Sequence, residues 1–201
     1  MSSIIISILF FRYTNVALPT TEYHVLTVNY YDDYNFPNAP TIPTSVEGQT
    51  VFYNATTKPK GLPTGTYARV PETSVLYKNE TSYTLYDEKA RPIRNYTTNY
   101  LGGFTQVDSK LDWAGKTLYT VTTHSRSTTT ATVTVKDAFT YTAQDRLLTH
   151  THQINGGTIQ LLAKNDYNEL GQLISKNVGG TNVTGATSLQ KVDYSYNIRG
   201  W

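Results

Sequence analysis

Two histidines, His150 and His152, have the spacing in this chain that comes closest to a metal site. Side chains at i and i+2 of a β-strand project from one face, and two imidazoles on one face supply half of a tetrahedral zinc site. No third ligand lies at a suggestive distance in the sequence, and Leu148 and Ile154 flank the pair on that face. We therefore expect solvated or packed histidines, with no metal centre and no cofactor.

Paired carboxylates are the second candidate chemistry, because glycoside hydrolysis requires two acidic side chains on either side of the sugar bond. Asp87 and Asp112 recur at the same place in a repeated pattern, and a turn explains them without catalysis. Strand ends or exposed sites explain the remaining aspartates, and nothing marks His24 or His124 as a base beside a nucleophile. We expect no catalytic residues and no enzyme activity. The aspartates considered are Asp87, Asp112, Asp137, Asp166 and Asp193.

A repeated turn signature is a much stronger signal than either of these. Its clearest copy runs from Tyr167 to Ile174: an aromatic, an Asx residue, two variable positions, a glycine, a long polar residue and two apolar ones. The Asx side chain accepts a hydrogen bond from a backbone N–H further along, and glycine supplies the positive φ that closes a short hairpin loop. The signature therefore predicts a strand, a tight turn and a return strand.

Copies of the signature return at intervals of 25, 30, 26 and 29 residues, counted between the residues that begin each copy. A period of this size predicts an array of units that bury their faces only against one another. Further turn signals lie between the copies, at Gly102-Gly103, 127–129, Asn155 to Gly157 and Gly179-Gly180. The predicted turn residues are Tyr86, Asp87 and Arg91; Asp112 and Gly115, after Leu111; Tyr141, Asp145 and Arg146; Tyr167, Asn168 and Gly171; and Tyr196, Asn197 and Gly200.

The predicted fold class is all-β, an antiparallel array of β-hairpins in a twisted, meandering sheet. Strands of roughly 8–11 residues run from one set of turns to the other. Residues 81–201 form this array, and residues 1–80 form an irregular β-rich region with Pro/Gly-rich connectors that precedes it. Within 131–142, apolar and threonine-rich faces alternate, which is typical of a sheet that borders water on one side.

The pattern Tyr-Asp-x-x-Gly-Arg-Leu at this period resembles the YD repeat of bacterial rearrangement hotspot (Rhs) proteins. The resemblance covers roughly residues 83–201, and the segments 86–91, 141–147 and 167–173 carry it best. The closing segment 192–201 resembles the repeat form of Bacteroidetes members upstream of their core domain.

Three positions depart from the repeat pattern. Ala90 and Asp145 stand where glycine is usual, and Leu111 stands where tyrosine is usual. We expect either that the turns at these positions are looser or that Asp145 adopts the left-handed αL conformation, which aspartate tolerates better than most residues.

The resemblance implies a non-catalytic segment of a hollow β shell that encloses a C-terminal toxin or effector domain of the parent polypeptide. It also implies a secreted or cell-surface bacterial protein whose partners are the rest of that polypeptide and its cargo. In the family, an aspartyl autoprotease in the core region releases the cargo, and no position here matches its aspartates. The alternative is a cell-surface adhesin or carbohydrate-binding module, in which Tyr194, Tyr196 and Trp201 stack on sugar rings.

The composition agrees with exposed β-sheet, since 17 of 201 residues are tyrosine and only 16% are charged. A net charge of +2 gives no argument for nucleic-acid binding, and the absence of cysteine excludes disulfides. The apolar run 4–11 is too short to span a bilayer, and residues 1–3 lack the basic charge of a signal peptide. We expect a buried strand there, or the remnant of a targeting segment, and no membrane span.

Three further expectations concern the sheet edges and the region before the array. The alternation across 22–36 predicts a strand buried on both faces or packed at an end of the sheet, and Leu62 to Gly65 predicts a turn. An array that ends in mid-repeat leaves an open sheet edge, and open edges recruit other chains. We therefore expect the isolated chain to self-associate edge to edge.

Overall fold

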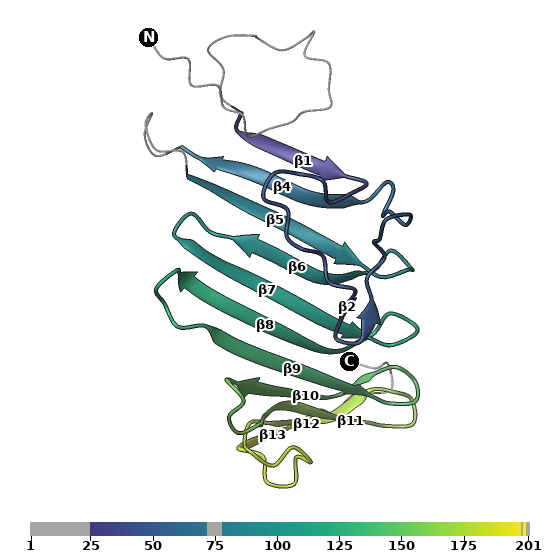
Figure 1. The fold of residues 1–201 in the computed structure, drawn as a ribbon. Coiled ribbons are helices and arrows are strands. Elements are labelled where there is room, and N and C mark those ends of the chain that lie inside the picture. Colours follow the sequence, from purple (N-terminus) through teal and green to yellow (C-terminus); the bar gives the residue numbers. More distant parts are fainter. Residues whose placement is uncertain (1–24, 72–77, 198, 200–201) are drawn as a thin grey trace, which may run out of the picture. The chain divides into compact units, whose positions relative to one another are not determined.

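The computed structural model describes residues 25–71, 78–197 and 199, so the strand expected at 4–11 lies outside the described residues. The described part is all-β, and eleven of its strands form one antiparallel sheet in the order β1-β4-β5-β6-β7-β8-β9-β10-β11-β12-β13 (Figure 1). From β4 onward each strand pairs with the next along the chain, which confirms the predicted antiparallel meander. No helix in this part of the chain is long and apolar enough to cross a membrane.

The strand lengths agree with the expected range for most of the array, although β6, β12 and β13 are shorter. The sheet consists of β1 (Thr27–Tyr31), β4 (Pro63–Val70), β5 (Lys78–Tyr86), β6 (Pro92–Thr98), β7 (Gly102–Leu111), β8 (Thr117–Ser127), β9 (Val133–Tyr141), β10 (Leu147–Ile154), β11 (Gln160–Tyr167), β12 (Leu173–Val178) and β13 (Gln190–Asp193). A separate small hairpin consists of β2 (Ser45–Val46) and β3 (Gln49–Thr50).

The chain divides into two compact units, which are described one at a time. Unit 1 contains the described residues up to Thr105 together with Arg126–Thr130, and unit 2 contains Gln106–Ser125 and the described residues from Ala131 onward. The boundary predicted at residue 80 falls within β5.

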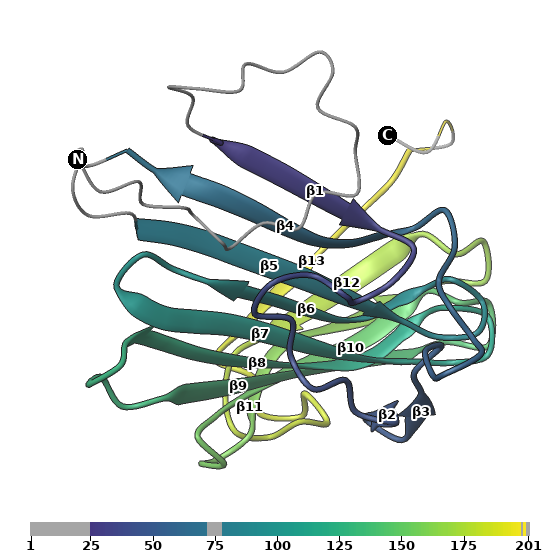
Figure 2. The same cartoon turned by 45° about the horizontal axis from the view of Figure 1, so that its top comes forward.

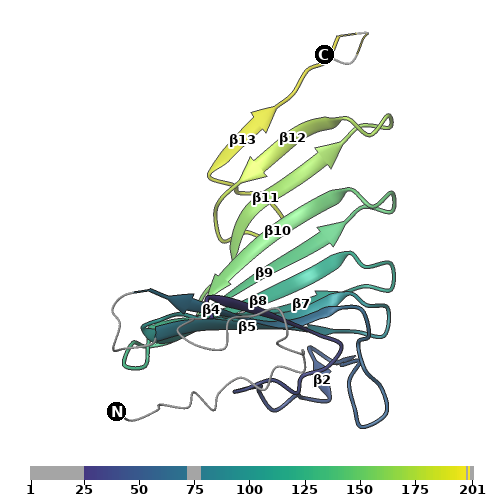
Figure 3. The ribbon, with the colours of Figure 1, turned by 90° about the horizontal axis from the view of Figure 1, so that it is seen from above.

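Unit 1 has a second layer, because the segment 32–62 with β2 and β3 folds back against one face of β4, β5 and β6 (Figures 2 and 3). The Phe52 N–H donates to the Tyr86 carbonyl at 2.8 Å, and the Tyr34 hydroxyl donates to the Thr84 carbonyl at 2.5 Å. Apolar side chains from both layers are removed from water, which is the main stabilising term for such a layer. The buried apolar side chains of unit 1 are Tyr34, Val46, Val51, Leu85, Tyr86 and Ile93.

β1 is an edge strand, so of the two arrangements expected for 22–36 the one packed at an end of the sheet is right. Tyr31, the last residue of β1, is 51% exposed, and Asp32, which follows it, has a φ of 73°. The turn predicted from Leu62 to Gly65 is wrong, since Pro63 begins β4 opposite Tyr31. Proline is tolerated at the first position of a strand, which is where Pro63 lies.

Unit 2 also folds a connection back onto its sheet. The loop between β12 and β13 begins at the predicted turn Gly179-Gly180 and returns over β11 and β12, where the Leu161 N–H donates to the Gly180 carbonyl at 2.8 Å. The Ser188 hydroxyl donates to Asn177 Oδ1 at 3.2 Å, and Leu161 is fully buried. This loop therefore covers part of one sheet face.

β13 is the other edge of the sheet, and all four of its residues are exposed. The Tyr194 N–H donates to the Ile174 carbonyl of β12 at 3.0 Å. N–H groups alternate in direction along an antiparallel strand, so those of Lys191 and Asp193 point away from β12. This edge therefore presents free backbone donors.

Candidate functional site: the repeated corners

Four turns at one side of the sheet share a single five-residue conformation, which we call a corner. Corners join β5 to β6, β7 to β8, β9 to β10, and β11 to β12. Each begins with a leading residue, has an αL residue three positions later and ends with a closing residue four positions later. The leading, αL and closing residues are Asp87, Ala90 and Arg91; Asp112, Gly115 and Lys116; Thr142, Asp145 and Arg146; and Asn168, Gly171 and Gln172.

The backbone hydrogen bonds of the four corners are the same. The leading N–H donates to the closing carbonyl at 2.8–3.0 Å, and the αL N–H donates to the leading carbonyl at 2.8–3.1 Å. The φ angles of Ala90, Gly115, Asp145 and Gly171 are 59°, 98°, 64° and 78°. This is a type I turn followed by one left-handed residue, a common three-residue hairpin loop. Of the two alternatives for Asp145 the αL conformation is the one observed, and Ala90 adopts it as well.

The leading side chain closes each corner. Its oxygen accepts the closing N–H at 2.9 Å in Asp87, 2.8 Å in Asp112, 3.2 Å in Thr142 and 2.9 Å in Asn168. Each such bond satisfies a backbone donor within the turn. A threonine hydroxyl supplies the same acceptor as an Asx oxygen, which explains how Thr142 replaces the expected Asp or Asn.

Asp87 is the most enclosed of the leading carboxylates, with 5% of its surface exposed. Arg91 Nε donates to Asp87 Oδ2 at 2.7 Å, and its terminal nitrogen lies 2.6 Å from the same oxygen. Burial by itself raises the pKa of Asp87, but the hydrogen bonds from Arg91 and Lys89 and the Arg91 charge outweigh it and hold that pKa below its usual range. Asp87 is therefore ionised over the whole neutral range.

The tyrosine before a corner binds back to an earlier strand. Tyr141, Tyr167 and Tyr196 each donate their hydroxyl to the carbonyl of the residue directly after the previous closing residue, at Thr117, Leu147 and Leu173, all at 2.8 Å. Tyr86 donates in the same way to the Pro63 carbonyl at 2.7 Å. Phenylalanine cannot form this bond, which gives a physical reason for tyrosine at these positions. Leu111 lacks the hydroxyl.

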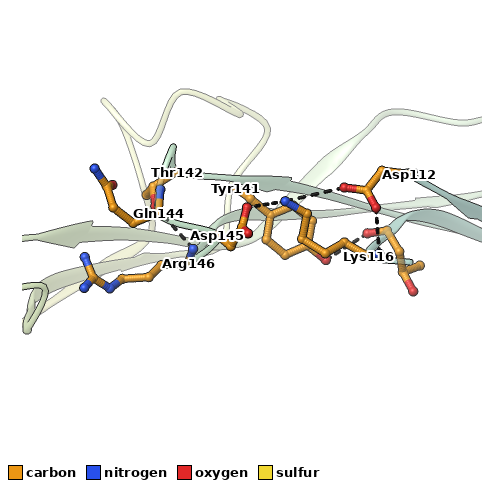
Figure 4. A network of polar contacts seen from close by, with 8 residues as sticks. Asp112, Lys116, Tyr141, Thr142, Gln144, Asp145 and Arg146 are labelled. Atoms are coloured by element: carbon orange, nitrogen blue, oxygen red, sulfur yellow. Dashed lines mark hydrogen bonds and ion pairs between the residues drawn. The ribbon is translucent and has the colours of Figure 1, made fainter. Parts of the chain in front are cut away.

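Side chains also link corner to corner in unit 2 (Figure 4). Lys116 lies 3.4 Å from the carboxylate of its own leading residue, Asp112, and forms an ion pair with Asp145 of the next corner. These carboxylates raise the pKa of Lys116, with the Asp145 hydrogen bond as the largest cause. The contact lies at the surface, so it organises the corners more than it stabilises them.

A fifth turn of the same kind was not predicted in full. At Gly102-Gly103, which the sequence marks only as a turn, Asn99 acts as the leading residue: its N–H donates to the Gly103 carbonyl at 3.0 Å, and its Oδ1 accepts the Gly103 N–H at 2.9 Å. The order Asn-x-x-Gly is the signal that identifies it. Thr98 precedes it in place of an aromatic residue, which hid the match.

The two histidines on β10 share one carboxylate. His150 Nε2 and His152 Nδ1 each lie 2.9 Å from Asp137 Oδ1, and the His150 ring stacks on Phe139 at 4.6 Å. Burial raises the pKa of Asp137, while the hydrogen bonds from His152 and then His150 lower it further than that, so the net shift is downward. Within the described residues no group of three or more His, Cys, Asp or Glu side chains is arranged to hold a metal ion. Of the two arrangements expected for the histidines, solvated or packed, the contacts with Asp137 and Phe139 favour packed side chains.

The other candidate aspartates are held by neighbouring side chains. Asp166 accepts the Ser175 hydroxyl at 2.8 Å and lies 3.5 Å from the Lys164 ammonium. Asp193 lies 2.8 Å from Lys191 on the exposed β13. Asp87 and Asp112 lead corners, so the five aspartates are spread over separate structural roles.

An aromatic row crosses three strands of unit 1. Tyr83 and Tyr96 have ring centroids 4.9 Å apart with planes 18° apart, and Tyr96 and Phe104 have centroids 5.5 Å apart with planes 16° apart. The rings therefore face one another. A sugar that stacks on an aromatic side chain needs an exposed ring face, and here the faces of Tyr96 are covered by its neighbours.

The last copy of the signature is described in part. Tyr196 binds Leu173 as given above, and Asn197 Oδ1 accepts the Arg199 N–H at 2.9 Å, the start of an Asx turn. Gly200 and Trp201 lie outside the described residues.

Comparison with protein-family models and with curated proteins found no match to this chain.

Proposed function

We propose that this chain is a non-catalytic structural segment of a β wall, as in the Rhs/YD-repeat shells that its sequence resembles. In the parent protein the wall encloses a C-terminal toxin or effector domain. The observation that carries the proposal is the tyrosine-to-carbonyl bond, which ties one hairpin to the hairpin before it at Tyr141, Tyr167 and Tyr196. A sheet whose hairpins are joined in this way at three successive tyrosines is suited to act as a continuous barrier.

Polar contacts between side chains on neighbouring strands support the same role. Hydroxyl and amide side chains on neighbouring strands bind one another: Thr66 with Ser82 at 2.6 Å and Thr84 with Asn95 at 3.0 Å in unit 1, and Thr140 with Thr149 at 2.5 Å in unit 2. Cross-strand pairs of this kind stabilise a sheet. Side chains that are already paired with one another have fewer hydrogen-bonding groups left to bind an enclosed cargo.

The carbohydrate-binding alternative has weaker support. The rings of Tyr83, Tyr96 and Phe104 cover one another, and the Tyr196 hydroxyl is engaged with the Leu173 carbonyl. These contacts give structural roles to Tyr83, Tyr96 and Tyr196 without a sugar ligand.

Two experiments test the proposal. Sequencing the source DNA downstream of this segment is expected to show an Rhs core domain followed by a toxin or effector domain, and an unrelated domain in that place would refute the shell. A glycan array with the purified chain is expected to show no selective binding. Selective binding at micromolar affinity would instead support the adhesin.

A further inference from the structure

Two closing residues, Lys116 and Arg146, extend beyond their own corner to the next one. The Lys116 ammonium lies 5.4 Å from the centroid of the Tyr141 ring and ends on the carboxylate of Asp145 (Figure 4). The guanidinium carbon of Arg146 lies 5.8 Å from the centroid of the Tyr167 ring. In both cases a cation crosses the tyrosine that precedes the next corner, a favourable arrangement for the ring and the charge.

The two cations end on different αL residues. Lys116 meets Asp145, which supplies a counter-charge. Arg146 meets Gly171, and a Cβ placed on that glycine would collide with the guanidinium group. The guanidinium therefore occupies the space that a side chain at position 171 would fill. Lysine is matched with aspartate at one junction, and arginine is matched with glycine at the other.

We propose that the closing residue of one corner and the αL residue of the next form a matched pair that specifies which hairpin lies beside which. Lysine is a compact charge that binds an aspartate, whereas arginine is a planar group that lies flat over a ring and a bare Cα. Exchanging the two αL residues alone leaves Lys116 without its counter-charge at position 145. It also places a side chain at position 171, where the Arg146 guanidinium lies. Gly171 and the exceptional Asp145 thus follow from the closing residue of the preceding corner.

The need for such a pair follows from the uniformity of the corners. Their backbones bind in the same way, so the backbone alone does not distinguish one neighbour from another. Specificity requires contacts that reward the correct neighbour and penalise the wrong one. This inference concerns hairpin order, so it can hold whether or not the sheet encloses a cargo.

Variants of identical composition and net charge test the pairing in the full chain. The first exchanges the αL residues (D145G with G171D), the second exchanges the closing residues (K116R with R146K), and the third combines all four changes. We expect each exchange alone to lower the folding equilibrium constant of unit 2 about two- to tenfold, the range for an exposed ion pair together with a cation–π contact. The combined variant is expected to return to within about twofold of the wild type. If its loss equals the product of the two separate losses, the pairing does not exist.

A milder set of variants keeps the test valid if the exchanges prevent folding. D145N removes the charge but retains a residue that tolerates αL. It is expected to speed amide exchange in residues 142–146 in the wild-type background and to leave it unchanged in a K116Q background. E169Q, which removes an exposed acidic side chain from the next corner, serves as the control and should change neither rate. Equal acceleration by D145N in both backgrounds would overturn the proposal.

Discussion

Replacing Tyr86 with phenylalanine isolates the contribution of one tyrosine-to-carbonyl bond. The Tyr86 side chain is 8% exposed, and its hydroxyl donates to the Pro63 carbonyl at 2.7 Å. Phenylalanine keeps the ring and leaves no cavity, so packing against the layer formed by residues 32–62 is retained. The backbone bond from the Phe52 N–H to the Tyr86 carbonyl is also unaffected.

The magnitude follows from the surroundings of the bond. A neutral intramolecular hydrogen bond contributes about 0.5–1.5 kcal/mol net, and an acceptor left buried without a partner costs about 1–3 kcal/mol. Pro63 is an exposed residue at the start of β4, so water can reach part of its carbonyl. We therefore expect Tyr86→Phe to lower the free energy of unfolding of unit 1 by about 1 kcal/mol, a loss that applies to the unit as a whole.

The assay is urea unfolding followed by far-UV circular dichroism, with Tyr96→Phe as the matched control in the same unit. Tyr96 is half-buried and stacks between Tyr83 and Phe104, and its hydroxyl forms no hydrogen bond within the described residues. Its replacement should change the free energy of unfolding by less than about 0.5 kcal/mol. Equal effects of the two replacements would show that the hydroxyl bond to Pro63 carries no stability, and the reasoning about these tyrosines would fail.

Three other perturbations have definite expected outcomes. Thr64→Val replaces a fully buried hydroxyl, which has no hydrogen-bond partner among the described residues, with a methyl group. The free energy of unfolding should stay level or rise by up to about 1 kcal/mol, as measured by urea unfolding, and a clear loss would indicate a hidden partner. Asp87→Asn keeps an oxygen acceptor but loses the charge paired with Arg91. The folded-state pKa of Asp87 lies below its unfolded value, so its contribution to stability is present above about pH 4 and is lost as the pH falls through the folded-state pKa. The free energy of unfolding should therefore fall less steeply with acid in the variant than in the wild type. Identical slopes would contradict this. Asp193→Pro removes a backbone donor from the outer edge of β13 and should weaken the concentration-dependent self-association measured by light scattering. Val192→Pro should instead disrupt the pairing of β13 with β12. If Asp193→Pro has no effect, chains do not associate through this edge.

The corners were predictable from the sequence because their determinants are local. A leading Asp or Asn, a residue that tolerates αL and a preceding tyrosine all lie within six residues, and short-range hydrogen bonds fix the conformation. The departures at Ala90 and Asp145 did not change the backbone, since both corners keep the same short-range hydrogen bonds. Strand pairing from β4 to β13 followed from the order of the corners.

Contacts between distant residues were not predictable in this way. The sequence places Leu62 to Gly65 among turn-forming residues, yet β1 and β5 pair on either side of this segment and hold it as a strand. Asp137 lies 13 and 15 residues from the two histidines that it binds, and only the register of β9 and β10 brings them together. The second layer of unit 1 depends in the same way on the hydrogen bonds from Tyr34 and Phe52 to β5, which lies far along the chain.

Site-resolved amide hydrogen exchange on the full chain tests the central claim most directly, namely that one hydrogen-bonded corner recurs and turns the chain into a continuous sheet. The account predicts slow exchange at the closing amides, each of which donates to a leading side chain, at Arg91, Lys116, Arg146 and Gln172. The exposed amides at Glu88 and Glu169 should exchange quickly by comparison. Rapid exchange at all four closing amides would contradict the account.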